Sequence, residues 1–186
     1  MTDVYTTVAS ELSFFTPRAT ALSMATETRS AFDSYSPMTR LQHGLVGGLV
    51  AGVVFGLMIQ FALDRMTAIG AMYTLGDPSL SVGWVAHILH SVLFGAFFAV
   101  LGGPRLVSFL DGYTAGAVGG VAYGAALWAV NIVVLWPLWL GAVSLTAAPS
   151  VPYLAPRPLV GHLVYGLLLG LAVTALGARA KVPQEG

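Results

Sequence analysis

The sequence predicts an all-α membrane protein, a four-helix transmembrane bundle built from two parallel two-helix repeats with glycine-ladder packing. Composition is the first reason: of the 186 residues, 56% are hydrophobic and 9% are charged, whereas soluble domains carry about 25% charged residues. The second reason is that four apolar stretches are each long enough to cross a hydrocarbon core of about 30 Å. The third is that glycine recurs at every fourth position in two of these stretches.

Two glycine ladders are the feature around which the rest of the chain is organised. Their members are Gly44, Gly48, Gly52 and Gly56, and then Gly112, Gly116, Gly120 and Gly124. Residues four apart lie on one face of a helix, so each ladder leaves a strip of backbone without side chains. Each glycine costs a helix about 1 kcal/mol relative to alanine. Such strips are typical of membrane helices whose backbones pack closely together.

The apolar stretches and the breaks between them predict the spans. We expect spans over residues 41–63, 83–102, 112–136 and 159–176. Asp64 and Arg65 follow the first span, and Pro137 is expected to end the third because proline breaks helices. Residues 138–156 are uncharged but interrupted by prolines, so we predict an interfacial cap there rather than a span.

The remaining segments complete the predicted organisation. Residues 1–37 are rich in Ser and Thr and are expected to form a flexible extension. The alternative is that translation starts at Met38, directly before the first span, and that the extension is not part of the native fold. The first membrane repeat then covers residues 38–110 and the second covers residues 111–180, with a tail over residues 181–186.

Similarity between the two halves extends beyond the glycines. Residues 69–79 align with residues 140–150, and residues 87–95 align with residues 162–170. Each half is therefore predicted to consist of a glycine-rich helix, a cap and a helix that carries histidine. Because two spans per unit is an even number, both units enter the membrane from the same side. The predicted pseudo-two-fold axis runs along the membrane normal.

The basic residues predict the orientation, since cytoplasmic loops carry an excess of Lys and Arg. Arg65 and Arg157 lie on one predicted side of the membrane. On the other side we expect Arg18, Arg29, Arg40, Arg105, Arg179 and Lys181. The sequence therefore predicts a multi-pass protein of the cell (plasma) membrane with both termini in the cytoplasm.

Polar residues in the outer half of the spans are the pocket candidates, because buried polar groups in membranes suggest function. They are Gln60, Asp64, His87, His90, Asn131, His162 and Tyr165. We expect His87 and Gln60 at similar depth, and both histidine helices to turn small residues toward the ladders. The simpler interpretation is that these groups join helices by hydrogen bonds worth about 0.6–2 kcal/mol.

The favoured function is a non-enzymatic membrane protein whose polar outer-leaflet pocket binds or passes a small solute, ion or proton. One alternative is a b-type haem or metal protein that uses His87 and His162; otherwise no cofactor or metal is expected. Another is a structural subunit that packs on a partner through its glycine faces. The lipid bilayer is the expected environment, with a homo-oligomer or a larger membrane partner as further possibilities. A net charge of zero gives no reason to expect nucleic acid.

Three parts of the chain resemble a known family. They are the glycine-rich first span, the run Gly-Trp-x-x-His-x-x-His-Ser-x-x-Phe-Gly at residues 83–95 and the echo Gly-His-x-x-Tyr-Gly at residues 161–166. Over about residues 38–178 they resemble small four-span archaeal membrane proteins, found mainly in haloarchaea, whose function is not established. Such proteins are sometimes called histidine kinases, but this chain has no ATP-binding boxes of a kinase. The resemblance implies the four-span architecture and no activity.

Overall fold

The computed structural model describes residues 36–101, 112–143 and 148–179, and it is helical without strands in these ranges. Four helices are long and apolar enough to cross a membrane, which confirms the predicted fold class. Most of the predicted extension, residues 1–35, and the predicted tail lie outside the described residues. Pro37, the last residue assigned to that extension, is instead the first residue of a helix.

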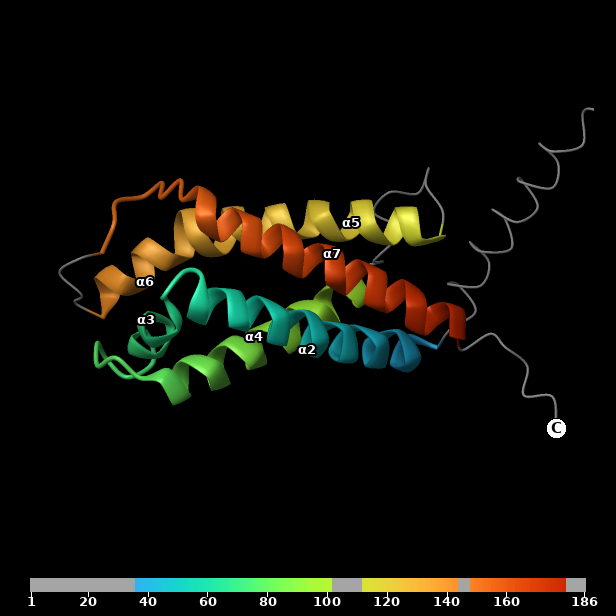
Figure 1. Ribbon diagram of the computed structural model, residues 1–186, viewed down its shortest axis with the longest axis horizontal. Coiled ribbons are helices and arrows are strands. Elements are labelled where there is room, and N and C mark those ends of the chain that lie inside the picture. Colours follow the sequence, from blue (N-terminus) through green and yellow to red (C-terminus); the bar gives the residue numbers. More distant parts are fainter. Residues whose placement is uncertain (1–35, 102–111, 144–147, 180–186) are drawn as a thin grey trace, which may run out of the picture. The chain divides into compact units, whose positions relative to one another are not determined.

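Figure 1 shows the order of the elements. They are α2 (Pro37–Phe61), α3 (Met66–Ala71), α4 (Leu80–Val100), α5 (Gly112–Trp128), η3 (Ala129–Leu135), α6 (Trp136–Ala142) and α7 (Pro156–Arg179). The start of α2 follows from local sequence, because the Ser36 hydroxyl accepts the Thr39 N–H at 3.1 Å and proline fits the first turn. The Ser79 hydroxyl caps α4 in the same way.

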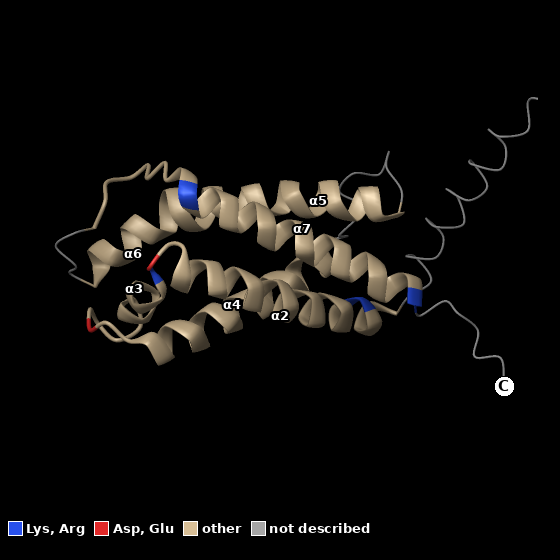
Figure 2. Cartoon of the chain, in the orientation of Figure 1, with Lys and Arg blue, Asp and Glu red and all other residues tan. Residues whose placement is uncertain are grey.

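The long helices form two antiparallel pairs that meet through one helix of each. α2 packs against α4, α5 packs against α7, and the pairs join where α2 contacts α7 (Figure 1). The short helix α3 packs against α4. In Figure 2 the charged residues lie near the ends of the long helices and their middles are uncharged, as lipid contact requires.

Most of the glycine ladder positions face small residues or backbone of the partner helices, whereas Gly56 faces the Trp84 ring. A Cβ atom on Gly48 would collide with the Ser91 carbonyl oxygen, and one on Gly120 would collide with the Gly166 carbonyl oxygen. Gly95 in turn meets the backbone of Gly48. Two backbones therefore touch where any side chain would separate them, which explains why glycine is kept despite its cost to the helix.

Gly112 is the exception in the predicted ladders. Among the described residues, no atom lies within 4 Å of the position that a Cβ atom would take. Its φ angle is +56°, a left-handed conformation that glycine adopts without strain. Gly112 is therefore explained by the backbone at the start of α5, and the packed part of the second ladder begins at Gly116.

The third span is longer than predicted. α5, η3 and α6 form one apolar segment of 31 residues from Gly112 to Ala142. The predicted end at residue 136 is therefore wrong, and the first part of the predicted cap over residues 138–156 is helix. A straight helix of this length would measure about 46 Å, which exceeds the hydrocarbon core of about 30 Å. The end of α6 is therefore expected to extend into the interface.

A π-helical stretch allows the chain to remain helical through Pro137. Proline has no N–H to offer the carbonyl four residues earlier, which is that of Val133. In η3 the bonding shifts, and the Trp136 N–H reaches the Asn131 carbonyl, five residues back. The Val133 carbonyl accepts the Tyr153 N–H at 3.0 Å instead. The segment before α7 thus supplies the bond that Pro137 cannot make.

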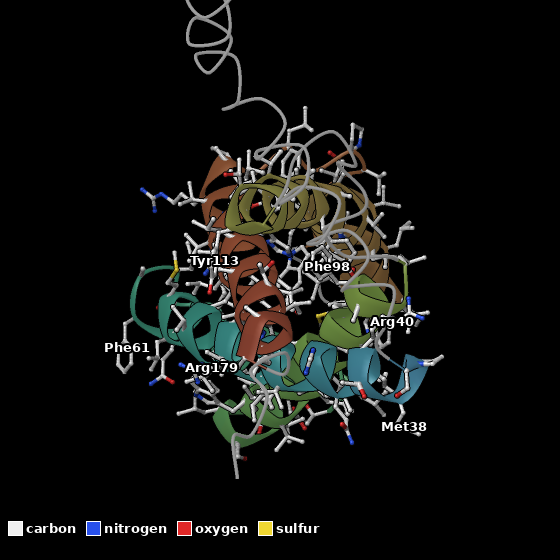
Figure 3. All side chains as sticks on the ribbon, turned by 90° about the vertical axis from the view of Figure 1, so that its right-hand side faces the viewer. Met38, Arg40, Phe61, Phe98, Tyr113 and Arg179 are labelled. Carbon is white, nitrogen blue, oxygen red and sulfur yellow. The ribbon has the colours of Figure 1, made fainter. Side chains whose placement is uncertain are left out.

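The interior of the bundle is aromatic and aliphatic. Its largest fully buried side chains are Tyr165, Phe98, Met66, Leu169 and Val173. Phe61, by contrast, is 76% exposed and points away from the helices, whereas Phe98 lies among them (Figure 3). Exposed apolar side chains of this kind are expected where a helix faces lipid.

Candidate functional site

A chain of hydrogen bonds around His87 joins three helices. The Nε2 atom of His87 donates to the Gly52 carbonyl at 2.9 Å, since a carbonyl can only accept. The Ser91 hydroxyl donates to the His87 carbonyl at 2.8 Å. The buried Tyr165 hydroxyl then donates to the Ser91 carbonyl at 2.6 Å. These side chains connect α2, α4 and α7 through backbone carbonyls, as polar groups in membrane interiors commonly do.

Phe55 of α2 lies against both histidine helices. Its ring centroid is 5.5 Å from that of His87 and 4.9 Å from that of His162, both in edge-to-face geometry. The Tyr165 ring lies at 6.2 Å. The two histidines at equivalent positions in the two halves therefore share one buried aromatic neighbour.

Gln60 and Asp64 lie elsewhere than expected. The Gln60 side-chain oxygen accepts the Trp84 indole N–H at 2.6 Å, so its hydrogen-bonding partner is Trp84 and not His87. Asp64 is exposed after the end of α2 and has a positive φ of 51°. Both residues therefore belong to the end of α2 and do not line the cavity at this end of the bundle.

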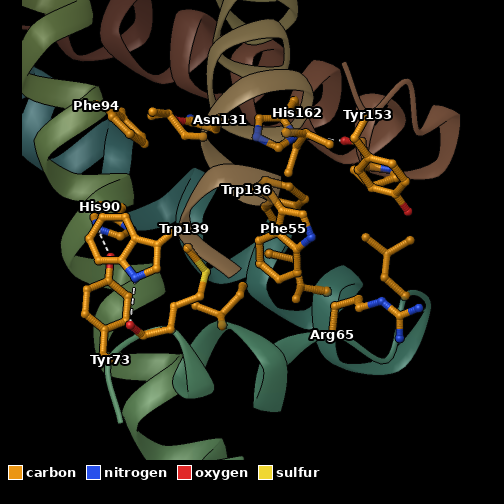
Figure 4. Close-up of a pocket in the computed structure, with 17 residues that line it drawn as sticks. Phe55, Arg65, Tyr73, His90, Phe94, Asn131, Trp136, Trp139, Tyr153 and His162 are labelled. Carbon is orange, nitrogen blue, oxygen red and sulfur yellow. Dashed lines mark hydrogen bonds between the residues drawn. The ribbon is translucent and has the colours of Figure 1, made fainter. Parts of the chain in front are cut away.

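That cavity, of about 260 Å³, opens between α2, α3, α4, the η3–α6 segment and the start of α7. Figure 4 shows it in close-up. Its aromatic lining consists of Phe55, Tyr73, Phe94, Trp136, Trp139 and Tyr153. Among the described residues that line it, Arg65 alone carries a formal charge, and none is Asp or Glu. The chemistry of this cavity is that of an aromatic box with few polar groups, rather than the polar pocket that the sequence predicted.

Two polar side chains in the lining have bonding capacity to spare. The Nδ1 atom of His162 donates to the Pro158 carbonyl at 2.8 Å, which leaves Nε2 of the neutral ring as an acceptor. The Asn131 amide makes no hydrogen bond to the described residues. No fully buried side-chain nitrogen or oxygen among these residues lacks a partner. The Nε2 atom of His162 and the Asn131 amide must therefore reach open space, and Figure 4 places both along one side of the cavity.

A second group of polar contacts forms the opposite wall. The Tyr73 hydroxyl and Nε2 of His90 are 2.8 Å apart and share a hydrogen bond. The Trp139 indole N–H donates to the Met72 carbonyl at 2.7 Å, which ties α6 to the end of α3. Partial burial raises the pKa of Tyr73, so its hydroxyl keeps its proton at neutral pH. These groups already have hydrogen-bond partners, so they form a wall of the cavity and are not expected to bind a ligand by hydrogen bonds.

Three of the seven predicted candidates therefore line the cavity and four do not. His90, Asn131 and His162 line the cavity. Gln60, Asp64, His87 and Tyr165 do not line it. Three members of the aromatic lining lie outside the predicted spans, Tyr73 between the first two spans and Trp139 and Tyr153 in the predicted cap, so they were not considered as pocket residues. Trp and Tyr gather at membrane interfaces, and the tryptophans and tyrosines between residues 73 and 153 were the available signal.

The described residues include no group of three or more His, Asp or Glu side chains able to hold a metal ion. No protein-family model, curated protein or solved structure matches this chain. The resemblance to haloarchaeal four-span proteins therefore stays a prediction, and the case for a function rests on the geometry of the cavity.

Proposed function

We propose that this chain is a non-enzymatic, multi-pass membrane protein whose cavity binds a small, largely apolar molecule. The observation that carries the proposal is the pair of unpaired polar groups, Asn131 and Nε2 of His162, in a wall of aromatic side chains. Binding sites for small molecules typically combine an apolar lining with a few polar groups that fix orientation.

Charge and packing favour binding of a neutral molecule over passage of an ion. The described lining has no carboxylate to stabilise a cation. Farther along the bundle, Phe98, Leu169 and Val173 are at most 1% exposed, so close-packed side chains occupy the interior there. These features support a binding site at one end of the bundle rather than a path through it.

The cavity also sets the size of the ligand. An engineered apolar cavity of about 150 Å³ holds one benzene molecule. A cavity of about 260 Å³ is therefore expected to hold a molecule, or part of one, with about ten non-hydrogen atoms. Naphthalene is a suitable first probe because it has this size and no polar group.

We expect that filling the cavity abolishes binding of naphthalene. Ile132 lines the cavity, so Ile132→Trp places a large ring inside it. Val134, two residues along the same π-helical stretch, is 40% exposed and does not line the cavity. Val134→Trp is therefore the matched control. Equilibrium dialysis against protein in lipid nanodiscs measures the naphthalene retained beyond lipid alone.

The expected result is retention by the parent and by Val134→Trp, and none beyond the lipid background by Ile132→Trp. Equal retention by the parent and both variants would mean that naphthalene is dissolved in the surrounding lipid. The cavity would then not be a binding site, and the proposal would be wrong.

The proposed orientation puts both termini in the cytoplasm and the cavity in the outer leaflet of the cell membrane. The chain has no cysteine, so single-cysteine variants give clean labels. Asp77 and Ser150 are exposed near the cavity end, and Met38 is 63% exposed at the start of α2. A membrane-impermeant maleimide is expected to label Asp77→Cys and Ser150→Cys in intact cells but not Met38→Cys. The reverse pattern would invert the orientation and move the cavity to the inner leaflet.

The internal duplication belongs to the same proposal. Gly44 meets Gly95 and Ala99, and the aligned Gly116 meets the aligned positions Gly170 and Thr174. These matching contacts support two parallel repeats that derive from one two-helix unit. Equivalent positions in the two halves can therefore be compared residue by residue.

Haem binding is the less favoured alternative. Bis-histidine ligation would need free nitrogens on His87 and His162, and the Phe55 ring packs against both imidazoles. Nε2 of His87 and Nδ1 of His162 already donate to carbonyls. A Soret band that disappears in His87→Ala would establish haem. The structural-subunit alternative would appear instead as a stable homo-oligomer or as a second membrane protein that copurifies.

A further inference from the structure

The two helix pairs meet on two sides that pack differently, α2 with α7 and α4 with α5, and the cavity is lined from α2, α4, η3 and α7. On the α2–α7 side, small residues allow close contact: a Cβ atom on Gly47 would touch Leu169 and Val173. One on Gly161 would collide with the ring of Phe55. This side is therefore closed by direct contact of the two helices.

Larger side chains separate α4 and α5 on the other side. The Tyr123 hydroxyl donates to the Phe94 carbonyl at 2.8 Å, and the Tyr123 and Phe98 rings lie 5.2 Å apart. In the alignment of the two halves, Tyr123 corresponds to Ala51 and Phe94 corresponds to Leu169. The aligned residues are larger here, and α4 and α5 approach each other less closely than α2 and α7 do.

The alignment also identifies what the cavity lacks. In the closed interface, the Phe55 ring packs against three side chains: His87, His162 and Tyr165. The residue aligned with Phe55 is Leu127, which is smaller and does not line the cavity. The residues aligned with His87 and Tyr165 are His162 and His90, and both line it. The cavity therefore has counterparts of two of the three partners of the Phe55 ring; the residue aligned with the third, His162, is His87, which does not line it.

We propose that the cavity binds an aromatic alcohol, a phenol or hydroquinone type of molecule, whose ring packs against His162 and His90 as the Phe55 ring packs against the aligned His87 and Tyr165. This inference rests on the proposed function, since it names the class of the bound molecule. Edge-to-face contacts with Phe94, Trp136 and Trp139 suit a planar ring.

The hydroxyl follows from the two unpaired polar groups. Nε2 of His162 is an acceptor and needs a donor from the ligand, because Nδ1 already donates to the Pro158 carbonyl. The Asn131 amide offers both a donor and an acceptor to the same or a second ring oxygen. A ligand without an O–H group would leave Nε2 unpaired in an apolar site, which is unfavourable.

An anionic ligand is less well matched. Arg65 lines the cavity but is exposed, and its guanidinium donates to the Asp64 backbone carbonyl. In Figure 4 it lies at the edge of the cavity, away from Asn131 and His162. A carboxylate that reached Arg65 would therefore place its apolar part away from the two unpaired polar groups.

The test compares four probes of similar size: naphthalene, 1-naphthol, 1-methoxynaphthalene and 1-naphthoate. Dialysis against nanodiscs that contain the parent, Asn131→Leu, His162→Phe or Arg65→Gln gives each dissociation constant. Val134→Leu is the control on the same π-helical stretch, because Val134 does not line the cavity. Thermal unfolding of each variant checks that it is folded. If His162→Phe does not fold, Asn131→Leu still tests the proposal.

The parent is expected to bind 1-naphthol about tenfold more tightly than naphthalene or 1-methoxynaphthalene, the effect of one to two net hydrogen bonds. Asn131→Leu and His162→Phe should each bring the ratio of the two dissociation constants toward one, whereas Val134→Leu should keep the ratio of the parent. Equal binding of naphthalene and 1-naphthol by the parent would overturn the aromatic-alcohol assignment while the proposed function stands. Preference for 1-naphthoate that is lost in Arg65→Gln would also overturn it. If no probe binds, the proposed function itself fails.

Discussion

Replacing Gly120 by leucine is expected to destabilise the folded bundle strongly. A Cβ atom at this position already collides with the Gly166 carbonyl oxygen, and the clash is with backbone that cannot rotate away. Overpacking costs about 1–3 kcal/mol in soluble cores, and we expect the upper end of this range or more. The corresponding fall in melting temperature is about 6–12 °C for a chain of this size, measured by thermal unfolding in detergent.

Gly141 provides the matched control. It lies inside helix α6, and no described atom is within 4 Å of the position that its Cβ atom would take. Gly141→Ala is therefore expected to leave the melting temperature unchanged or to raise it slightly, since alanine favours a helix by about 1 kcal/mol over glycine. If Gly120→Leu melts like the parent, the second glycine ladder faces lipid and α5 does not pack against α7 as described.

The helices were predictable because they depend on local sequence. Uncharged apolar stretches must be helical to satisfy their backbone groups in lipid, and glycine at every fourth position indicates which face packs. The helix starts at Pro37 and after Ser79 also depend on adjacent residues, although the predicted spans began later, at residues 41 and 83. The predicted break at Asp64 and Arg65 was correct, since these two charged residues lie between the end of α2 and the start of α3.

The continuation through Pro137 was not predictable from the local sequence. Proline ordinarily ends a helix because a carbonyl loses its partner. Here the partner comes from the Tyr153 N–H, which is distant in sequence and reaches the Val133 carbonyl only in the folded chain. A tertiary hydrogen bond thus overrides the local rule, and the π-helical register of η3 is part of the same arrangement.

The candidate site also combines a part that the local sequence predicts and a part that depends on contacts in the folded chain. Position along a helix predicted a common depth for the candidates, and three of them, His90, Asn131 and His162, line one cavity. Depth does not determine which way a side chain points. Tyr165 is directed to the Ser91 carbonyl and Gln60 to Trp84, and these directions depend on how the helices are rotated in the bundle.

Replacing Phe55 by alanine is expected to destabilise the bundle almost as much as the change at Gly120. Phe55 is 6% exposed and its ring contacts His87, His162 and Tyr165, so it connects three of the four spans. Phe→Ala changes cost about 3–5 kcal/mol in soluble cores. In a membrane the transfer part of that cost is small because lipid is as apolar as the protein interior. The loss of contacts remains, so we expect a cost of about 2–3 kcal/mol and a melting temperature lower by about 4–12 °C.

Phe61 separates the loss of packing from the loss of a large apolar side chain. It lies six residues along the same helix and is 76% exposed (Figure 3), so Phe61→Ala removes the same atoms from contact with lipid. That variant is expected to melt within about 2 °C of the parent, the shift given by a surface substitution of about 0.5 kcal/mol. Benzene should raise the melting temperature of Phe55→Ala more than that of Phe61→Ala, because apolar cavities of this size bind it.

Equal melting of the two variants would mean that Phe55 does not hold α2, α4 and α7 together. The closed interface would then be no guide to what the cavity binds, so this result bears on the aromatic-alcohol assignment as well as on the stability of the bundle.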